Sequence, residues 1–286
     1  MELAARKKTF KYGELSVTGK VFVYILLLLG LCLFGFPVYW MISTSLQTLG
    51  QVHQQLMFPK TFQWDNYKEV FGTHPMGMYL WNTSWYTFLS MFGAAFSSSL
   101  VAFAFARLRA RGSTVLFALI LSTMMIPGQV TMIPQYLIFN KLGWIDSYLP
   151  LIIPSFGASA FLIFLLRQFY LGIPKELDEA VKIDGGGYFT MYFRIILPLS
   201  IPAIATAGIM EFMYRWNDLM GPLIYLSTQT KYPLSLGLAA FRGAYGTTPW
   251  NLLMAASFVA VIPPLTLFFF AQKYFIQGIV ISATKG

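Results

Sequence analysis

The sequence predicts an all-α polytopic membrane protein with six transmembrane helices. Of its 286 residues, 57% are hydrophobic and 11% are charged, whereas ordinary soluble domains are about 25% charged. Six apolar stretches are long enough to cross the hydrocarbon core, which takes about 20 helical residues. We expect each to be a helix, because lipid offers no partner to unpaired backbone groups. The predicted spans are residues 21–42, 85–106, 113–138, 149–168, 200–226 and 251–275.

The first 20 residues are basic and precede the first span. They contain five Lys or Arg and two Glu, and the run 21–40 that follows contains no charge. A cleaved signal peptide is the alternative, with Ser43-Thr44-Ser45 as its candidate cleavage site. The run is longer than the apolar core of a signal peptide and ends in aromatic residues, so we expect a retained anchor. The chain is therefore divided into a cytoplasmic segment, 1–20, and a six-helix transmembrane domain, 21–286.

Polar loops and helix breaks separate the next three spans. Residues 44–81 form the longest polar loop, whose scattered aromatic side chains favour a position at the membrane interface. The second span is rich in Gly, Ala and Ser, which permit close helix packing in lipid. In the third span, Pro127 and Pro134 remove backbone donors, so we expect a broken helix there.

The fifth span contains most of the charge expected at membrane depth. Glu211, Arg215 and Asp218 are spaced four and three residues apart, which places them on one face of a continuous helix. Two interpretations remain open: an internal Glu211–Arg215 salt bridge, or a polar pathway along this face. In the sixth span, the pair Pro263-Pro264 predicts a bend.

The distribution of basic residues orients the predicted spans. With the N-terminus inside, fourteen Lys and Arg residues fall in segments predicted to be cytoplasmic and five in the outer loops. Such an excess follows the positive-inside rule. It predicts an N-in/C-in topology, in which the polar loop 174–198 is cytoplasmic.

The loop 174–198 combines charge, glycine and apolar residues between two spans. Apolar residues recur at helical spacing up to Val181, which predicts a short amphipathic helix. Asp178 and Lys182 have the spacing of an ion pair within that helix. Gly185 can end it, and the two glycines that follow allow a sharp reversal of the chain. A helix, a tight turn and a second helix are therefore expected at the membrane face.

This loop resembles the EAA loop of ABC importer permeases. Glu179-Ala180-Val181, then Gly185 and then Ile195-Ile196-Leu197-Pro198 follow the pattern E-A-A, three residues, G, nine residues, I-x-L-P. Val181 replaces the second alanine and keeps a small apolar residue on the expected docking face. Residues 123–130 and 164–169, Trp216-Asn217-Asp218 followed by Pro222-Leu223, and the terminal Lys285-Gly286 resemble the carbohydrate-uptake branch, in particular the shorter G-type subunit of maltose permeases. The similarity covers most of residues 15–286. The resemblance implies the type I ABC importer permease fold.

The resemblance also implies a set of partners for the loop and for the chain. The loop would dock on an ATPase through Glu179, Ala180, Val181, Asp184, Gly185, Ile195, Leu197 and Pro198. The other implied partners are a second, F-type permease, two copies of a P-loop ATPase or an ATPase heterodimer, and an extracytoplasmic sugar-binding protein at the bacterial inner membrane. The sequence has no P-loop motif. We therefore expect ATP and Mg on the partner ATPase, no cofactor, metal or catalytic residue on this chain, and no nucleic-acid partner.

A sugar is the substrate class that the resemblance implies, with glycerol phosphate or a related polyol as the alternative. Sugars are bound by planar polar groups and aromatic faces, so the candidate pathway residues are Gln129, Glu211, Arg215, Trp216, Asn217 and Asp218. An ion-coupled secondary carrier and a membrane enzyme are the other classes considered. No internal repeat supports a carrier, and His53, His74 and Cys32 do not form a reactive set.

Overall fold

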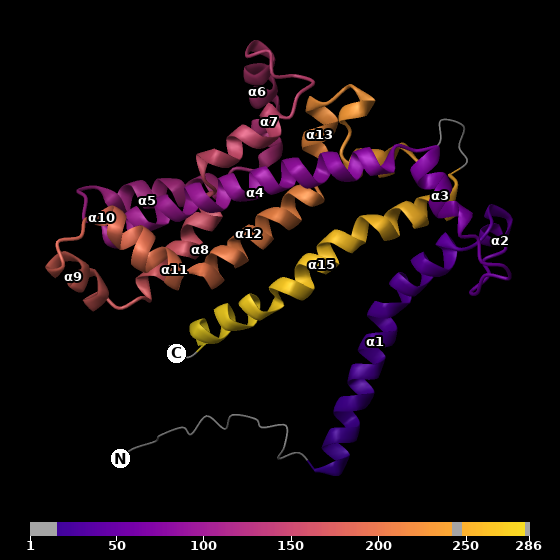
Figure 1. The fold of residues 1–286 in the computed structure, drawn as a ribbon, viewed down its shortest axis with the longest axis horizontal. Helices are drawn as coiled ribbons and strands as arrows, with labels where there is room; N and C mark the ends of the chain where they lie inside the picture. The colour runs from indigo at the N-terminus through magenta and orange to yellow at the C-terminus, as the bar shows by residue number, and fades with distance from the viewer. Residues whose placement is uncertain (1–15, 242–247, 284–286) are drawn as a thin grey trace. The chain divides into compact units, whose positions relative to one another are not determined.

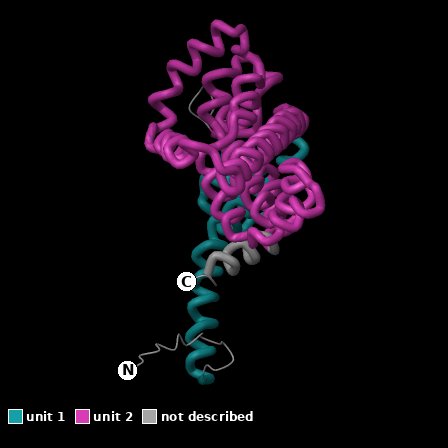
Figure 2. The backbone as a smooth tube through the Cα atoms, turned by 90° about the vertical axis from the view of Figure 1, so that its left-hand side faces the viewer, with its two compact units in different colours: residues 1–69, 249–258 teal, residues 70–248, 259–286 magenta. Residues whose placement is uncertain are grey.

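The computed structural model describes residues 16–241 and 248–283, in which helices are joined by short connections and no strand occurs (Figure 1). The chain divides into two compact units, residues 1–69 with 249–258 and residues 70–248 with 259–286 (Figure 2). In the described part, four helices are long and apolar enough to cross a membrane, or up to six spans if each of two bent pairs counts as one. The all-α prediction is confirmed, and the count of six depends on those bent pairs.

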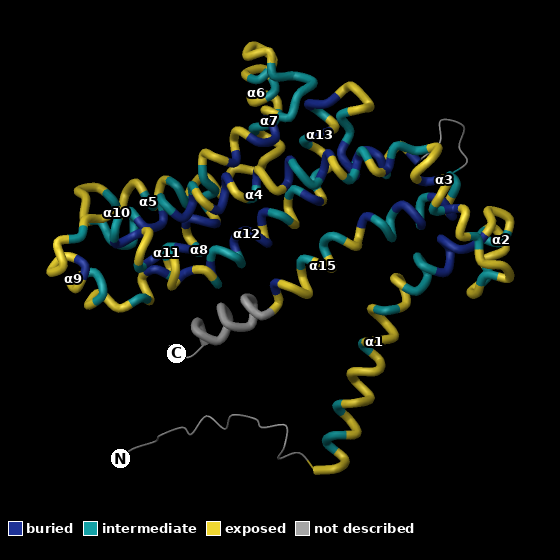
Figure 3. The backbone as a smooth tube through the Cα atoms, viewed as in Figure 1, coloured by how far each residue is buried: buried dark blue, intermediate teal, exposed yellow. Residues whose placement is uncertain are grey.

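The first unit contains α1 (Val17–Ser45), α2 (Leu49–His53), most of α3 (Asp65–Gly72) and the start of α15 (Trp250–Ala283). Most residues of α1 are exposed (Figure 3), and these include most of its large apolar residues, as expected of a surface that faces lipid. Of the predicted N-terminal segment 1–20, residues 1–15 lie outside the described residues.

One buried asparagine organises the polar loop of the first unit. The Asn66 Nδ2 donates to the carbonyl oxygens of Ser45 at 2.8 Å and Gln47 at 2.9 Å. Its Oδ1 accepts a hydrogen bond of 3.0 Å from Asn251 Nδ2. Buried amides need such partners because an unpaired polar group is costly away from water. The part of the predicted loop that belongs to the first unit is therefore ordered around this side chain.

The second unit is built around α4 (Met76–Arg107), which packs against α8 (Ala160–Leu171) and α12 (Ile201–Trp216) (Figure 1). The α4 residues buried in this packing include Gly93, Ala94, Ala95, Ser98, Ser99 and Ala102. A Cβ added to Gly93 would lie 2.6 Å from the Phe156 ring. The close packing predicted from the small residues is confirmed, and the helix begins nine residues before the predicted span.

The predicted break in the third span is present. The α5 helix (Ser113–Ser122) and η2 (Thr123–Met125) are followed by α6 (Gly128–Lys141), with a bend of 97° between the two halves. Pro127 lies at the break, where its missing N–H cannot continue a helix. Pro134 lies inside α6. The fourth span consists of α7 (Leu149–Ile152), the 3₁₀ segment η3 (Ile153–Gly157) and α8.

The prediction of one continuous helix over 200–226 is wrong. The α12 helix ends at Trp216, and α13 (Met220–Tyr225) follows as a separate short helix. The Asn217 Nδ2 donates to the Met213 carbonyl at 2.7 Å, and Asp218 Oδ1 accepts from the Gly221 N–H at 3.0 Å. Such local side-chain hydrogen bonds compete with helix continuation.

The helix that precedes α12 joins it at a bend of 76°. It comprises α10 (Tyr188–Thr190), the π-helix η4 (Met191–Ile196) and α11 (Leu197–Leu199). The chain continues after α13 through η5 (Gln229–Lys231) and α14 (Leu234–Ala240) to α15, in which Pro263 and Pro264 lie without ending the helix.

Candidate functional site

The predicted amphipathic helix of the loop 174–198 is present as α9 (Glu176–Ile183). Three acidic residues occupy its first turn and Lys182 its last, an order that suits the helix dipole. Its inner face is anchored by Val181, which is 7% exposed. Val181 belongs to a cluster of buried apolar residues from α4, α8, α9, η4 and α12, called the core cluster below, which includes Met191 and Tyr192. The expectation that Val181 lies on a docking face is therefore wrong, because its side chain packs inside its own chain.

The other face of α9 is open to solvent. We define the α9 outer face as the exposed helix residues Glu179, Ala180, Lys182 and Ile183, together with the exposed Asp184 that caps the helix. Ile183 is 86% exposed, and Phe189, just beyond the glycine turn, is 81% exposed. Contiguous apolar patches rimmed by polar residues mark protein-binding surfaces, and we expect Ile183 and Phe189 to contribute to such a surface.

The three glycines that follow α9 differ in whether, and why, the turn needs glycine at their position. Gly185 has φ +76, in the left-handed region that commonly ends helices and favours glycine. A Cβ on Gly186 would lie 2.6 Å from Val181 Cγ1 and 3.0 Å from the Val181 carbonyl oxygen. A Cβ on Gly187 would meet nothing within 4 Å. The sharp turn thus depends on backbone freedom at Gly185 and on space at Gly186.

A buried ion pair holds α9 to the end of α4. The Arg107 Nη1 lies 3.1 Å from Asp178 Oδ2, and these side chains are 2% and 13% exposed. The Arg107 Nη2 also donates to the Ile173 carbonyl at 2.8 Å. Sequence spacing instead paired Asp178 with Lys182, which is exposed. The Arg107–Asp178 pair was missed because helical spacing detects partners only within one helix.

The remaining loop residues support α9 from within the second unit. Ile195 and Leu197 pack against the core cluster, whereas Pro198 is exposed on α11. Beneath them, the Ser99 hydroxyl is hydrogen-bonded to Tyr170 Oη at 2.6 Å and to Tyr192 Oη at 2.7 Å. These bonds join α4, α8 and η4, so the support of the loop is continuous with the transmembrane core.

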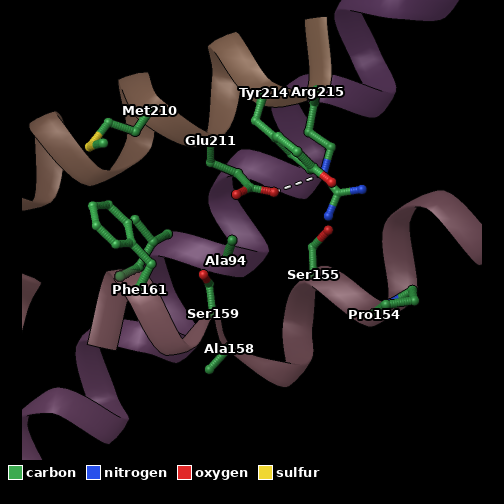
Figure 4. A pocket seen from close by; sticks show the side chains of 11 residues that line it. Ala94, Pro154, Ser155, Ala158, Ser159, Phe161, Met210, Glu211, Tyr214 and Arg215 are labelled. Atoms are coloured by element: carbon green, nitrogen blue, oxygen red, sulfur yellow. Dashed lines mark hydrogen bonds and ion pairs between the residues drawn. The ribbon is translucent and has the colours of Figure 1, made fainter. Parts of the chain in front are cut away.

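A pocket of about 450 Å³ lies between α4, η3, α8 and α12 (Figure 4). Its lining residues are Ala94, Pro154, Ser155, Ala158, Ser159, Phe161, Leu162, Met210, Glu211, Tyr214 and Arg215. The Arg215 Nε donates to Glu211 Oε1 at 2.7 Å, and the guanidinium carbon is 5.3 Å from the centre of the Tyr214 ring. The interpretation as an internal salt bridge is therefore confirmed, and the pair lines a pocket, whereas a polar pathway along this face stays a prediction.

The other predicted pathway residues do not line this pocket. Trp216 is 5% exposed and donates from Nε1 to the Ala260 carbonyl at 3.2 Å. Asn217 and Asp218 make the local hydrogen bonds that end α12, so Asp218 does not share a helix face with Glu211 and Arg215. Gln129 is exposed in the first turn of α6.

Sequence reasoning missed Ser155 and Ser159. They lie in and just after the 3₁₀ segment η3, where helical periodicity provides no signal. In the part of the chain whose side chains are described, no three His, Cys, Asp or Glu residues lie close enough to hold a metal ion.

Comparison with known proteins identifies the family. The profile of the family described as "Binding-protein-dependent transport system inner membrane component" matches residues 98–281, which include α9, the glycine turn and the Glu211–Arg215 pair. The chain belongs to this family. It is a permease component of a transport system and a multi-pass membrane protein.

Curated relatives match this permease over most of its length. It is 30% identical over 270 residues to the probable ABC transporter permease protein YurM of Bacillus subtilis, covering 94% of this chain and 89% of that protein. It is 33% identical to the arabinooligosaccharides transport system permease protein AraQ of Halalkalibacterium halodurans, covering 80% and 81%. It is 31% identical to the sn-glycerol-3-phosphate transport system permease protein UgpE of Yersinia enterocolitica, covering 91% and 95%.

A solved structure has the same fold. It is the crystal structure of a bacterial ABC transporter involved in the import of the acidic polysaccharide alginate, with a TM-score of 0.80. The match covers 91% of this permease and 99% of that chain at 24% sequence identity. The ABC importer permease fold implied by the sequence is thereby confirmed.

Proposed function

We propose that this permease is the transmembrane subunit of an ATP-driven importer in the bacterial inner membrane, and that it translocates a sugar. The observation that supports the ATP-driven class is the division of α9 into two faces. The inner face is held by Val181 and Asp178, while Glu179 and Ile183 on the outer face are left for a partner. ATP would be bound and hydrolysed, with Mg, on two ATPase subunits that dock there.

Sugar is favoured as the substrate class by the names of the relatives. AraQ is named for arabinooligosaccharides, and the Bacillus subtilis permease YtcP, 32% identical, for polygalacturonan or rhamnogalacturonan. UgpE is named for sn-glycerol-3-phosphate, so this polyol phosphate is the second candidate. A binding protein outside the membrane would deliver the substrate, and a second, F-type permease would complete the translocation path.

The α4 helix connects α9 to the pocket. Docking of the ATPase on the α9 outer face would move α9, which is joined to Arg107 at the last turn of α4. The same helix contributes Ala94 to the pocket wall. Because small shifts at one site are amplified where packed helices have two arrangements, closure of the ATPase pair would reshape the pocket that contains Glu211 and Arg215.

The experiment that tests this function is affinity purification of the tagged permease from its native membrane. We expect a P-loop ATPase and a second permease to co-purify with the native chain, and the ATPase to be lost from Glu179→Lys. The matched control is Asp65→Lys, an equal charge change at a carboxylate that is 80% exposed on α3. A native chain that purifies alone and transports in vesicles without ATP would contradict the proposal and favour an ion-coupled carrier.

A further inference from the structure

The charge of the pocket between α4, η3, α8 and α12 is balanced. Of the eleven residues that line it, only Glu211 and Arg215 are charged at neutral pH. They form an ion pair of 2.7 Å, with side chains that are 10% and 17% exposed. A charge withdrawn from water is tolerated when it is paired. The pocket therefore presents a net formal charge of zero to a ligand.

An anionic group fits this pocket poorly. A carboxylate or phosphate could reach the Arg215 guanidinium only beside the Glu211 carboxylate, or by displacing it. The first position places two negative charges together where the surroundings screen them weakly. The second breaks a buried ion pair and leaves Glu211 unpaired. A cationic ligand meets the same obstacle at Arg215.

Hydroxyl groups fit the remaining polar atoms. Arg215 uses its Nε–H on Glu211, and its other guanidinium hydrogens make no hydrogen bond to the described residues. Ser155 donates to the Leu151 carbonyl at 3.5 Å, which leaves its oxygen able to accept. The Ser155 and Ser159 hydroxyls point across the pocket toward the wall that carries Arg215 and Glu211 (Figure 4). Because a hydroxyl both donates and accepts, it can use donors and acceptors that stand side by side.

The apolar part of the lining suits the C–H surface of such a ligand. Phe161 is 39% exposed and, together with Tyr214 and Met210, lines the pocket beside its polar atoms. A mainly apolar wall with a few placed polar groups is the usual form of a small-molecule site.

We infer that this pocket takes a neutral polyhydroxyl ligand, a saccharide or polyol without carboxylate or phosphate groups. This inference rests on the proposed function, since it names the substrate class of the proposed pathway. Glu211 acts as the specificity-determining residue, because it cancels the charge with which Arg215 would otherwise attract an anion. Arg215 and the two serines supply the hydrogen bonds.

The test compares two disaccharides that differ only at C6. The probes are α-1,4-galactobiose, which is neutral, and α-1,4-digalacturonate, which bears two carboxylates. Ligand-observed saturation-transfer NMR, which detects weak binding, is recorded on the full permease assembly in nanodiscs. We expect a signal from galactobiose and at least tenfold less from digalacturonate. Glu211→Gln should reverse this preference, because it leaves Arg215 uncompensated.

Two further variants separate charge from shape. Glu211→Arg combined with Arg215→Glu keeps a pair four residues apart and should retain the preference for galactobiose. Glu211→Gln combined with Arg215→Gln removes both charges and should bind neither probe strongly. Stronger binding of digalacturonate than of galactobiose to the native assembly would overturn the inference. It would also be overturned if neither probe bound, or if the native assembly and all variants gave equal signals with both probes. Co-purification of the ATPase is measured on the same samples, so failure of the proposed function is scored separately.

Discussion

The guanidinium of Arg107, the last residue of α4, lies 3.1 Å from the carboxylate of Asp178 on α9, and both side chains are largely withdrawn from solvent. This pair joins the helix at the centre of the second unit to the helix whose outer face is proposed to bind the ATPase. Since α4 also lines the pocket through Ala94, one rigid element connects the two candidate sites.

Removal of the Asp178 charge is expected to damage coupling. Asp178→Asn leaves Arg107 buried without its counter-charge, which costs roughly 3–5 kcal/mol when such a pair is broken. The apparent melting temperature of the purified permease should fall, and fewer substrate molecules should be transported per ATP hydrolysed. Fluorescence-detected size-exclusion chromatography after heating measures the first quantity, and reconstituted vesicles the second.

The helix-internal partner suggested by spacing serves as the control. Lys182→Gln should leave the melting temperature near its native value, because Lys182 is exposed and forms no ion pair with Asp178 in the structure. Exchange of the pair, Arg107→Asp with Asp178→Arg, should recover part of the loss. Equal losses of melting temperature in Lys182→Gln and Asp178→Asn would show that the interhelical pair has no special role.

The three adjacent glycines should respond differently to alanine. Gly186→Ala is expected to be the most destabilising, because the new methyl group would lie 2.6 Å from Val181 Cγ1. Gly185→Ala should cost about 1–2 kcal/mol for a left-handed residue, and Gly187→Ala should be tolerated. Melting temperatures of the three variants test the order, and Val181→Ala should partly rescue Gly186→Ala. A loss at Gly187 as large as at Gly186 would refute this account of the turn.

Loss of the Ser99 hydroxyl should cost more than loss of either tyrosine hydroxyl that it contacts. Ser99→Ala leaves the hydroxyls of Tyr170 and Tyr192 buried without this partner, at roughly 1–3 kcal/mol for each unsatisfied group. Tyr170→Phe and Tyr192→Phe each remove one hydrogen bond, and in each variant Ser99 keeps its hydrogen bond to the other tyrosine. Combining all three substitutions should restore stability relative to Ser99→Ala. No difference between Ser99→Ala and Tyr192→Phe in thermal unfolding would contradict the cluster.

Stability should depend on pH through Asp146, in the connection between α6 and α7. Hydrogen bonds from the side chains of Lys231 and Thr228, and from the backbone N–H groups of Thr228 and Ser227, hold the pKa of Asp146 well below its ordinary value. Since the folded pKa lies below the unfolded value of about 3.9, the stabilisation is complete above about pH 4 and is lost as the pH falls through the folded pKa.

The measurement is thermal unfolding of Asp146→Asn against the native chain over a pH series. We expect a constant deficit of the variant between about pH 5 and 8, which narrows only below about pH 4. Asp65→Asn is the control, because Asp65 is 80% exposed and should show no such deficit. A deficit that disappears already near neutral pH would mean that Asp146 is not the titrating group.

Local sequence was sufficient to predict most of the fold. Apolar length located the four spans that the described residues form without a sharp bend, Pro127 marked the break between α5 and α6, and Gly185 marked the end of α9. The prediction of one continuous helix for the fifth span was wrong because Asn217 and Asp218 satisfy backbone groups locally and end α12 at Trp216. Their side-chain bonds outweighed an apolar pattern that would otherwise extend to Leu226.

The sequence by itself determined what depends on neighbours along the chain: apolar spans, an amphipathic helix, a turn that needs glycine, and the spacing of Glu211 and Arg215. Only the tertiary structure decided which groups meet across helices. It paired Asp178 with Arg107 instead of Lys182, turned Val181 inward, and brought Ser155 and Ser159 to the Glu211–Arg215 pair. Helical periodicity specifies the face on which a residue lies, whereas the helix that covers that face is selected by packing of the whole unit.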